Sequence, residues 1–253
     1  DVFAFDKSFA ALDKNDALTV WGHYETPKVY KEKKILSTSH HQPSNSHYGG
    51  AFDINENYAA VFNSIGSGIS SSGIVYLYGK NEGGNNNWGL IKTFQNTNKL
   101  YSTVPNRDFG SSVVITDDTL YIGAKFAHNT DVSGGGAVFI YKKDYDPLTP
   151  NDISENAWGY HSRTDISFNS HLGVHGASFN HNSQFGADLS LYNDYIISGD
   201  YDSRAARGAI FLVQKDKGGT DNWGVIQRIE PPTEDTEANT MFGHTETYGI
   251  YGD

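Results

Sequence analysis

The feature that most restricts the fold of this chain is a sixteen-residue pattern that occurs three times without a gap. The copies read "YGGAFDINENYAAVFN" from Tyr48, "FGSSVVITDDTLYIGA" from Phe109 and "FGADLSLYNDYIISGD" from Phe185. In each copy a pair of turn-type residues, drawn from Asn, Asp and Glu, separates two apolar runs. Asn and Asp tolerate the left-handed backbone that tight hairpins need. Each copy is therefore predicted to form two antiparallel strands.

Two further strands are predicted after each of these hairpins. The third strand is rich in β-branched and aromatic residues and opens on a glycine, in "GIVYLYGK" from Gly73, "GAVFIYKK" from Gly136 and "GAIFLVQK" from Gly208. The fourth begins at a Trp-Gly pair, at Trp88, Trp158 and Trp223. Four short antiparallel strands that repeat are typical of a propeller blade. We therefore predict an all-β fold, a β-propeller of four-stranded antiparallel blades, with three full repeats and partial ones at both ends.

The repeat boundaries divide one predicted propeller domain over residues 1–253. We expect a partial blade at 1–42, blades at 48–105, 109–180 and 185–237, and the start of a further blade at 242–253. Trp21 stands at the end of a predicted third strand, so we do not group it with the Trp-Gly pairs that begin fourth strands. One blade cannot bury both faces of its sheet alone, and neighbouring blades should form one cooperative unit. Because the sequence stops within a repeat, we expect it to be a stretch of a longer polypeptide.

The composition excludes several kinds of partner and site. The formal charge is −11, which argues against a nucleic-acid partner or an anionic membrane. No segment approaches the apolar length that spans a bilayer, so we expect no direct membrane insertion. The chain has no cysteine, which excludes disulfides and thiolate chemistry. The common catalytic motifs for a serine nucleophile, a zinc protease or a phosphate loop are missing. We therefore expect no catalytic residue, no cofactor and no enzyme activity.

The repeats resemble a known family. The Phe-Gly starts and the "GAVFIY"-type third strands over residues 48–253 are similar to FG-GAP repeats, the blades of the integrin α-subunit propeller and of many bacterial and algal surface proteins. The N-terminal "SFAALDKNDALTVWG" resembles chromosome-condensation-regulator-type propeller repeats. Both resemblances imply a propeller. The chain departs from integrins in one respect, since its hairpins hold only "NEN", "TDD" and "YND", which are too short to enclose a calcium ion.

Two sets of residues are candidate metal ligands. Asp200 and Asp202 could bind a hard cation such as calcium, although Arg204 and Arg207 could neutralise them instead. Histidines in equivalent linkers should emerge on one face of a propeller, where they could bind zinc or respond to acid. This His-rich face would consist of His40, His41, His47, His161, His171, His175 and His181. No spacing in either set matches a metal motif, and the alternative for both is a solvated polar loop.

These observations lead to two main hypotheses for the function, and a metal-responsive scaffold that would use the candidate ligands above is a third. The first is a non-catalytic, extracellular or cell-surface module for protein–protein interaction, adhesion or assembly of a surface structure. Its partners would be other proteins, copies of itself or other domains of the same polypeptide. The alternative is a carbohydrate-binding or carbohydrate-active propeller that stacks a glycan on its repeated Trp side chains. Their identical place in each copy favours blade packing, so buried Trp side chains would support the first hypothesis.

Overall fold

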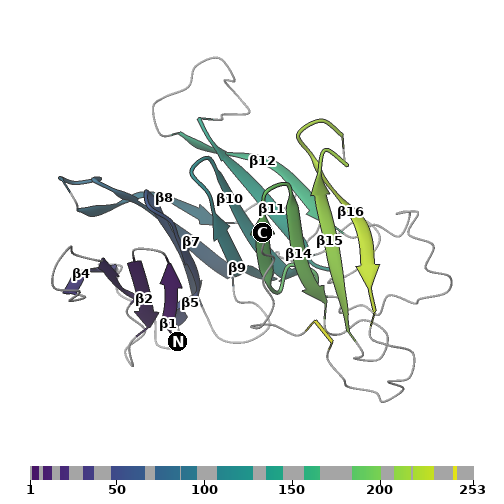
Figure 1. Cartoon of the computed structure of the whole chain (residues 1–253), viewed down its shortest axis with the longest axis horizontal. Helices are drawn as coiled ribbons and strands as arrows, with labels where there is room; N and C mark the ends of the chain where they lie inside the picture. Colours follow the sequence, from purple (N-terminus) through teal and green to yellow (C-terminus); the bar gives the residue numbers. More distant parts are fainter. Residues whose placement is uncertain are drawn as a thin grey trace.

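The chain is all-β and consists of four four-stranded antiparallel sheets (Figure 1). The computed structural model describes residues 2–5, 8–12, 18–22, 31–36, 47–65, 72–85, 87–95, 107–127, 135–144, 157–165, 184–200, 208–217, 219–230 and 242–243. No helix occurs in these ranges. In every sheet the strands pair in chain order, each with the one before it. This order confirms the predicted fold class, a β-propeller built from four-stranded blades.

The four sheets are called blades 1 to 4. Blade 1 consists of β1 (Val2–Phe5), β2 (Ser8–Leu12), β3 (Leu18–Gly22) and β4 (Lys31–Leu36). Blade 2 consists of β5 (His47–Ile54), β6 (Tyr58–Ile65), β7 (Ser72–Lys80) and β8 (Trp88–Gln95). Blade 3 consists of β9 (Arg107–Ile115), β10 (Thr119–Phe126), β11 (Ala137–Lys143) and β12 (Trp158–Asp165). Blade 4 consists of β13 (Leu189–Tyr192), β14 (Tyr195–Asp200), β15 (Ala209–Lys215) and β16 (Trp223–Ile229).

Blade 1 contains one more strand than its sequence pattern indicated. Only a partial blade was expected at 1–42, whereas the structure forms a four-stranded sheet there, with β1 paired to β2. β1 has only four residues and lacks the aromatic-Gly start of the other blades, which is why the repeat pattern did not reveal it. The N-terminal sheet therefore has the same strand number and order as the three blades that follow.

A register shift between the third and fourth strands recurs in all four blades. It lies at Val20/Trp21, Leu77/Tyr78, Ile140/Tyr141 and Leu212/Val213. Such a bulge bends the outer strand and increases its twist. Trp21 stands at this bulge, while the other three Trp residues are the first residues of β8, β12 and β16. The prediction that Trp21 does not belong to their series is confirmed.

The hydrophobic core lies in the seams where one blade packs against the next. The seam between blades 2 and 3 buries Tyr58, Ala60, Val75, Leu77 and Phe94 against Phe109, Val113, Ile115, Leu120, Ile122, Phe139, Tyr141 and Trp158. The seam between blades 3 and 4 buries Tyr121, Val138 and Ile140 against Phe185, Leu189, Ile196, Ala209, Phe211, Val213 and Trp223. Within blade 3, alternate residues of the third strand therefore face opposite neighbours, Phe139 and Tyr141 toward blade 2 and Val138 and Ile140 toward blade 4, as the alternation of side chains in a strand requires.

The third strands open on glycine because the aromatic-Gly start of the following repeat packs against that position. A Cβ on Gly73 would lie 1.6 Å from the carbonyl oxygen of Phe109, the residue that starts the next repeat. Gly136 forms a parallel bridge with Phe185, and Gly208 forms one with Phe242. We call these three contacts the glycine junctions. They bring the start of each repeat against the third strand of the preceding blade, where no side chain larger than hydrogen fits.

Candidate functional site

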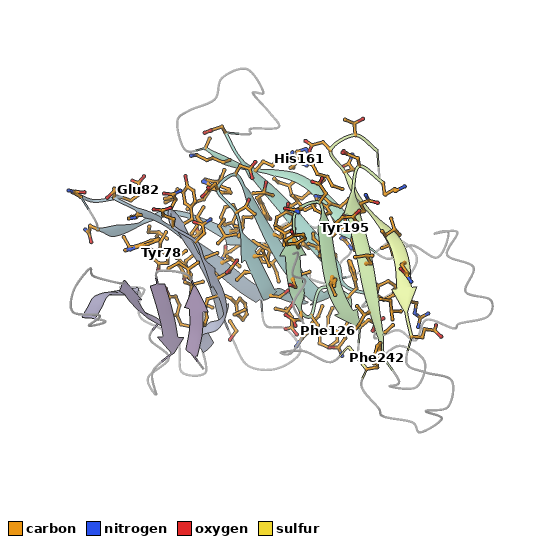
Figure 2. The ribbon with its side chains drawn as sticks, viewed as in Figure 1. Tyr78, Glu82, Phe126, His161, Tyr195 and Phe242 are labelled. Carbon is orange, nitrogen blue, oxygen red and sulfur yellow. The ribbon has the colours of Figure 1, made fainter. Side chains whose placement is uncertain are left out.

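The turns that join first to second and third to fourth strands lie at one end of the blades, called the hairpin end. Figure 2 shows Glu82 and His161 toward this end, and Phe126 and Phe242 toward the opposite one. The turns are held by their own side chains. Asn55 Oδ1 accepts hydrogen bonds from the backbone N–H groups of Asn57 and Tyr58, at 2.9 and 2.8 Å. The first-to-second-strand turn of blade 2 is therefore short and held by hydrogen bonds within the turn.

A lysine stands at the same place in blades 2, 3 and 4, as the last residue of the third strand. These residues, Lys80, Lys143 and Lys215, form what we call the lysine row. Each is followed by a residue in the left-handed conformation, with φ of 72° at Asn81, 53° at Asp144 and 65° at Asp216. Asn and Asp are the non-glycine residues that adopt this conformation most readily. A lysine followed by a left-handed residue thus recurs at the end of the third strand in blades 2, 3 and 4.

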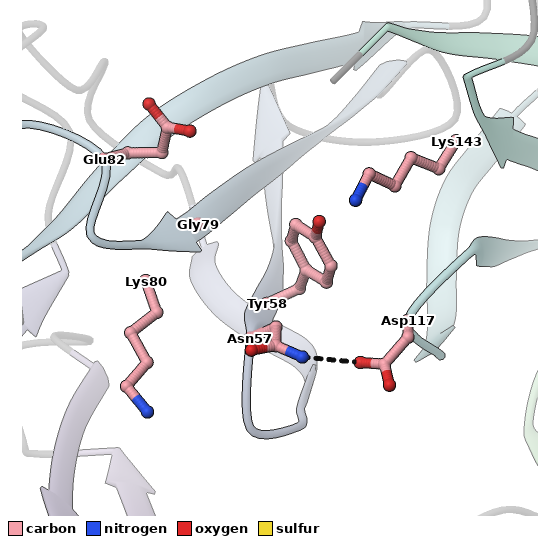
Figure 3. A pocket seen from close by; sticks show the side chains of 7 residues that line it. All are labelled: Asn57, Tyr58, Gly79, Lys80, Glu82, Asp117 and Lys143. Atoms are coloured by element: carbon pink, nitrogen blue, oxygen red, sulfur yellow. Dashed lines mark hydrogen bonds between the residues drawn. The ribbon is translucent and has the colours of Figure 1, made fainter. Parts of the chain in front are cut away.

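A polar pocket of about 430 Å³ opens at the hairpin end between blades 2 and 3 (Figure 3). It is lined by Asn57, Tyr58, Gly79, Lys80, Glu82, Asp117 and Lys143. One hydrogen bond crosses the seam here, from Asn57 Nδ2 to Asp117 Oδ1 at 3.0 Å. The lining side chains offer ammonium donors, carboxylate acceptors and an aromatic ring. They suit the polar and charged groups of a ligand or of a partner's side chains.

Lys143 and Tyr58 face each other across this pocket from different blades. The Lys143 ammonium lies 5.4 Å from the centroid of the Tyr58 ring, within the range of a cation–π contact. A hydrogen bond to the Tyr58 side chain raises the pKa of Lys143 above its ordinary value, so this lysine carries its charge at neutral pH. In Figure 3 the Lys143 side chain extends toward Tyr58, whereas that of Lys80 extends away from it.

A second charged group lies in the seam between blades 3 and 4. Asp221, in the turn before β16, contacts Lys142 of β11 and lies 3.8 Å from Lys215. His161 of β12 places its Nε2 atom 3.3 Å from Asp221 Oδ2. The contact with Lys142 lowers the pKa of Asp221. Burial, followed by the charge of Lys142, lowers the pKa of His161 below 6.5, so His161 is neutral at pH 7.

The structure describes only one of the two predicted carboxylate ligands, Asp200. Asp200 is fully buried at the end of β14, where its Oδ1 atom accepts a hydrogen bond from the Gln184 backbone N–H at 3.1 Å. Asp202 lies outside the described residues, so the Asp200–Asp202 pair stays a prediction. Within the described part of the chain no three His, Asp or Glu side chains gather as a metal site would require.

The predicted His-rich face is represented by one described side chain, that of His161. His47 begins β5, and its side chain is outside the described part. The remaining five positions also fall outside the described residues: His40, His41, His171, His175 and His181. The described neighbours of His161 include Lys142 and Asp221. The His-rich face thus stays a prediction.

The lysine row and its pocket were missed in the sequence, although a signal was present. All three third-strand sequences end in Lys, and each Lys is followed by Asn or Asp. This repeated pair marks the start of the turn between third and fourth strands. What the pattern could not show is that Lys143 lies across a seam from Tyr58, because that contact joins residues from two different blades.

One titratable group in the same seam couples two blades directly. Asp53 of β5 accepts hydrogen bonds from two backbone N–H groups, that of Ile54 at 2.9 Å and that of Ile115 in β9 at 2.8 Å. Burial raises the pKa of Asp53 from 3.8 to about 6, and the two hydrogen bonds only partly oppose this effect. The carboxyl group therefore takes up a proton within the seam at mildly acidic pH.

We expect Asp53 to make the protein less stable as pH rises from about 4 to about 6. In this window the folded chain, with a pKa of about 6, binds more protons at Asp53 than the unfolded chain, whose pKa is 3.8. Stability falls with pH wherever the folded state binds more protons. Urea unfolding at a series of pH values measures the effect, and Asp53→Asn should show a flatter dependence across this window. Equal slopes for the two proteins would refute the assignment.

The comparisons with known proteins gave structural likenesses only. No family model and no curated protein matches the sequence. A structure from Bacteroides fragilis, provisionally named a 6-phosphogluconolactonase, aligns with a TM-score of 0.48 and 11% identity over 91% of this chain and 56% of that chain. The N-terminal domain of Nup159 aligns with a TM-score of 0.43 and 12% identity over 94% of this chain and 55% of that chain.

A third structure, from Bacteroides uniformis, also carries the provisional name of a 6-phosphogluconolactonase. Its TM-score is 0.42 at 9% identity, over 90% of this chain and 70% of that chain. The present chain spans just over half the length of the first two structures. Within the described ranges there is no helix of the length and apolarity needed to cross a membrane.

The prediction that the chain is not an enzyme is corrected by these findings. Two of the three similar structures carry the name of an enzyme, which contradicts it. The physical weakness of that prediction lies in its basis, a search for contiguous sequence motifs. In a propeller, groups from different blades meet across seams, as Tyr58 and Lys143 do here, and such sites have no linear motif.

Proposed function

We propose that this chain is a β-propeller module of a cell-surface or extracellular protein, and that its hairpin end binds another protein. The observation that supports this proposal is the lysine row, a charged residue that stands at the end of the third strand in blades 2, 3 and 4. A repeat of this kind offers several identical contact points at fixed spacing. The surrounding acidic side chains, Glu82, Asp117 and Asp221, make the surface mixed in charge.

The resemblance to FG-GAP repeats supports an adhesive or assembly role for such a surface. Repeat architectures leave their turns free to vary while the seams hold the framework, which suits recognition. The pocket between blades 2 and 3 adds a recess into which a partner's side chain can fit. Its ammonium and carboxylate groups favour a partner segment that carries both hydrogen-bond donors and acceptors.

The burial of the Trp side chains bears on the carbohydrate alternative. Trp88, Trp158 and Trp223 are 9%, 1% and 7% exposed, and two of them pack edge-on against a Tyr ring of the preceding blade. The structural role predicted for these three residues is confirmed, and they offer no surface for stacking a sugar. The glycan alternative would have to use other aromatic residues, and strong selective binding on a glycan array would favour it over a protein partner.

Cross-linking in an extract of the source organism tests the proposal. With a lysine-reactive cross-linker, we expect a partner protein joined to Lys80, Lys143 or Lys215. Lys143→Glu should reduce recovery of that partner at least about tenfold, because it reverses one charge of the row and removes the contact with Tyr58.

The matched control for this experiment is Lys125→Glu. Lys125 is a partly exposed lysine of the same blade near Phe126, at the opposite end, where it lies 3.5 Å from Asp108. The two variants change the net charge equally, so a loss of binding in both would indicate a non-specific charge effect. Cross-links that map away from the hairpin end, or equal recovery with wild type and Lys143→Glu, would contradict the proposal.

A further inference from the structure

Blade 4 has one apolar face that the rest of the described chain does not cover. Leu77 and Ile140, which stand at equivalent places in the third strands of blades 2 and 3, are 0% exposed because the next blade packs on them. Their counterpart in blade 4, Leu212, is only half-buried. The same holds for Ile210, the counterpart of Val75 and Val138, which are buried to 0% and 1% exposure.

This open face extends across three strands of blade 4. Ile197 of β14 pairs directly with Leu212, and Ile229 of β16 pairs directly with Ile210. Directly paired residues in an antiparallel sheet project to the same face. Ile229 is 40% exposed, which is high for a large aliphatic side chain. Ile226, half-buried, is the counterpart of Ile91, which in blade 2 packs against the core of the next seam.

The glycine junction at the border of this face is already occupied. Phe242 bridges to Gly208 in the parallel sense, as Phe185 bridges to Gly136. The next residue repeats the geometry as well. A Cβ on Gly243 would lie 2.4 Å from the carbonyl oxygen of Ala209, and a Cβ on Gly186 would lie 2.5 Å from that of Ala137. Blade 4 therefore holds Phe242 and Gly243, the first two residues of a repeat, in the same way that blade 3 holds Phe185 and Gly186, the first two residues of the repeat that forms blade 4.

We propose that the open face of blade 4 is the docking surface for a further four-stranded blade, which begins at Phe242 and continues the same polypeptide. The proposal extends a pattern that is seen in the seams between blades 2 and 3 and between blades 3 and 4. In both, the blade whose aromatic-Gly start occupies the glycine junction also covers the apolar face beside it. The face that consists of Ile197, Ile210, Leu212, Ile226 and Ile229 has the apolar character that this cover requires.

A second copy of the chain is a less suitable occupant of this surface. Each chain carries a formal charge of −11, so two copies repel each other at low salt. The bridge at Phe242 also fixes where the covering strand starts and in which direction it runs. A blade that follows in the same chain meets both conditions without any loss of translational freedom, whereas a separate molecule has to lose that freedom on binding.

The first experiment compares Leu77→Lys with Leu212→Lys in the 253-residue chain. Both substitutions place a charge at the same position of the repeat. We expect Leu77→Lys to abolish cooperative unfolding or to lower the Tm by more than about 10 °C, and Leu212→Lys to lower it by less than about 3 °C. Light scattering should show a monomer. A dimer that Leu212→Lys dissociates would overturn the proposal in favour of a second copy.

The second experiment adds a blade of the proposed kind. The sequence "IYGD" at residues 250–253 resembles "LYND" at 191–194, with two more residues between it and the Phe-Gly pair, so a copy of residues 195–230 appended after Asp253 supplies the second, third and fourth strands after this turn. We expect the extended chain to have a higher Tm than the original, and Leu212→Lys to become as damaging in it as Leu77→Lys. An extension of the same thirty-six residues in permuted order is the control. An extended chain that gains no stability, or that tolerates Leu212→Lys, would overturn the proposal.

Discussion

Gly73→Ala should destabilise the protein by at least about 3 kcal/mol, at the upper end of what overpacking in a core costs. The added Cβ would lie 1.6 Å from the Phe109 carbonyl oxygen and 2.4 Å from the Phe62 ring. The carbonyl belongs to the backbone of the next blade, so relief requires the two blades to separate at this junction. Because the seam between them is one core, the damage should reach beyond the substituted strand.

Gly79→Ala is the matched control for this substitution. Gly79 lies in the same strand, but its added Cβ would meet side-chain atoms only, Cδ1 of Ile91 at 2.6 Å and Cγ of Glu82 at 2.8 Å. Side-chain ends can rotate away, and the cost should stay below about 1.5 kcal/mol. Urea unfolding followed by Trp fluorescence compares the two variants. A Gly73→Ala protein as stable as the Gly79→Ala protein would show that the glycine junction does not hold the blades together.

The repeat made most of the fold predictable from the sequence. Three copies of one pattern give three independent observations of each turn, and the Asn and Asp residues of the hairpins have a physical reason to stand there. The glycines that open the third strands were visible too, but their purpose was not. That purpose depends on the Phe-Gly start of the following repeat, which comes more than thirty residues later in the chain. A contact of this length leaves no local signal.

The candidate site was less predictable, for a related reason. A search for contiguous motifs and for metal-ligand spacing directed attention to histidines and to Asp200, whereas the structure shows a pocket made from the turns of two blades. Lys143 and Tyr58 meet there although eighty-five positions separate them. Asp53 shows the same limit, because its hydrogen bond to Ile115 in the next blade could not be read from the sequence around it.

Trp158→Ala should cost about 3–5 kcal/mol, the range for removal of a buried aromatic side chain from a core. Trp158 is 1% exposed, and its ring meets that of Tyr58 edge-on at a centroid distance of 5.4 Å. The substitution leaves a cavity between blades 2 and 3 that rigid neighbouring sheets cannot close. It also removes the ring against which Tyr58 packs, and Tyr58 lines the pocket at the hairpin end. The pocket should therefore lose its shape together with the seam.

Two further variants separate ring packing from other effects of this substitution. Within the described part of the chain the buried Trp158 indole N–H has no hydrogen-bond partner, so Trp158→Phe should cost about 2 kcal/mol or less. Leu90→Ala changes a residue of the neighbouring fourth strand that is 51% exposed, and should stay within about 0.5 kcal/mol of wild type. Guanidinium unfolding of the three variants measures their free energies of unfolding and so ranks the three substitutions. If Trp158→Ala were no more destabilising than Leu90→Ala, packing in the seams would not be what holds successive blades together. The seams would then not be the framework that fixes the turns of the hairpin end.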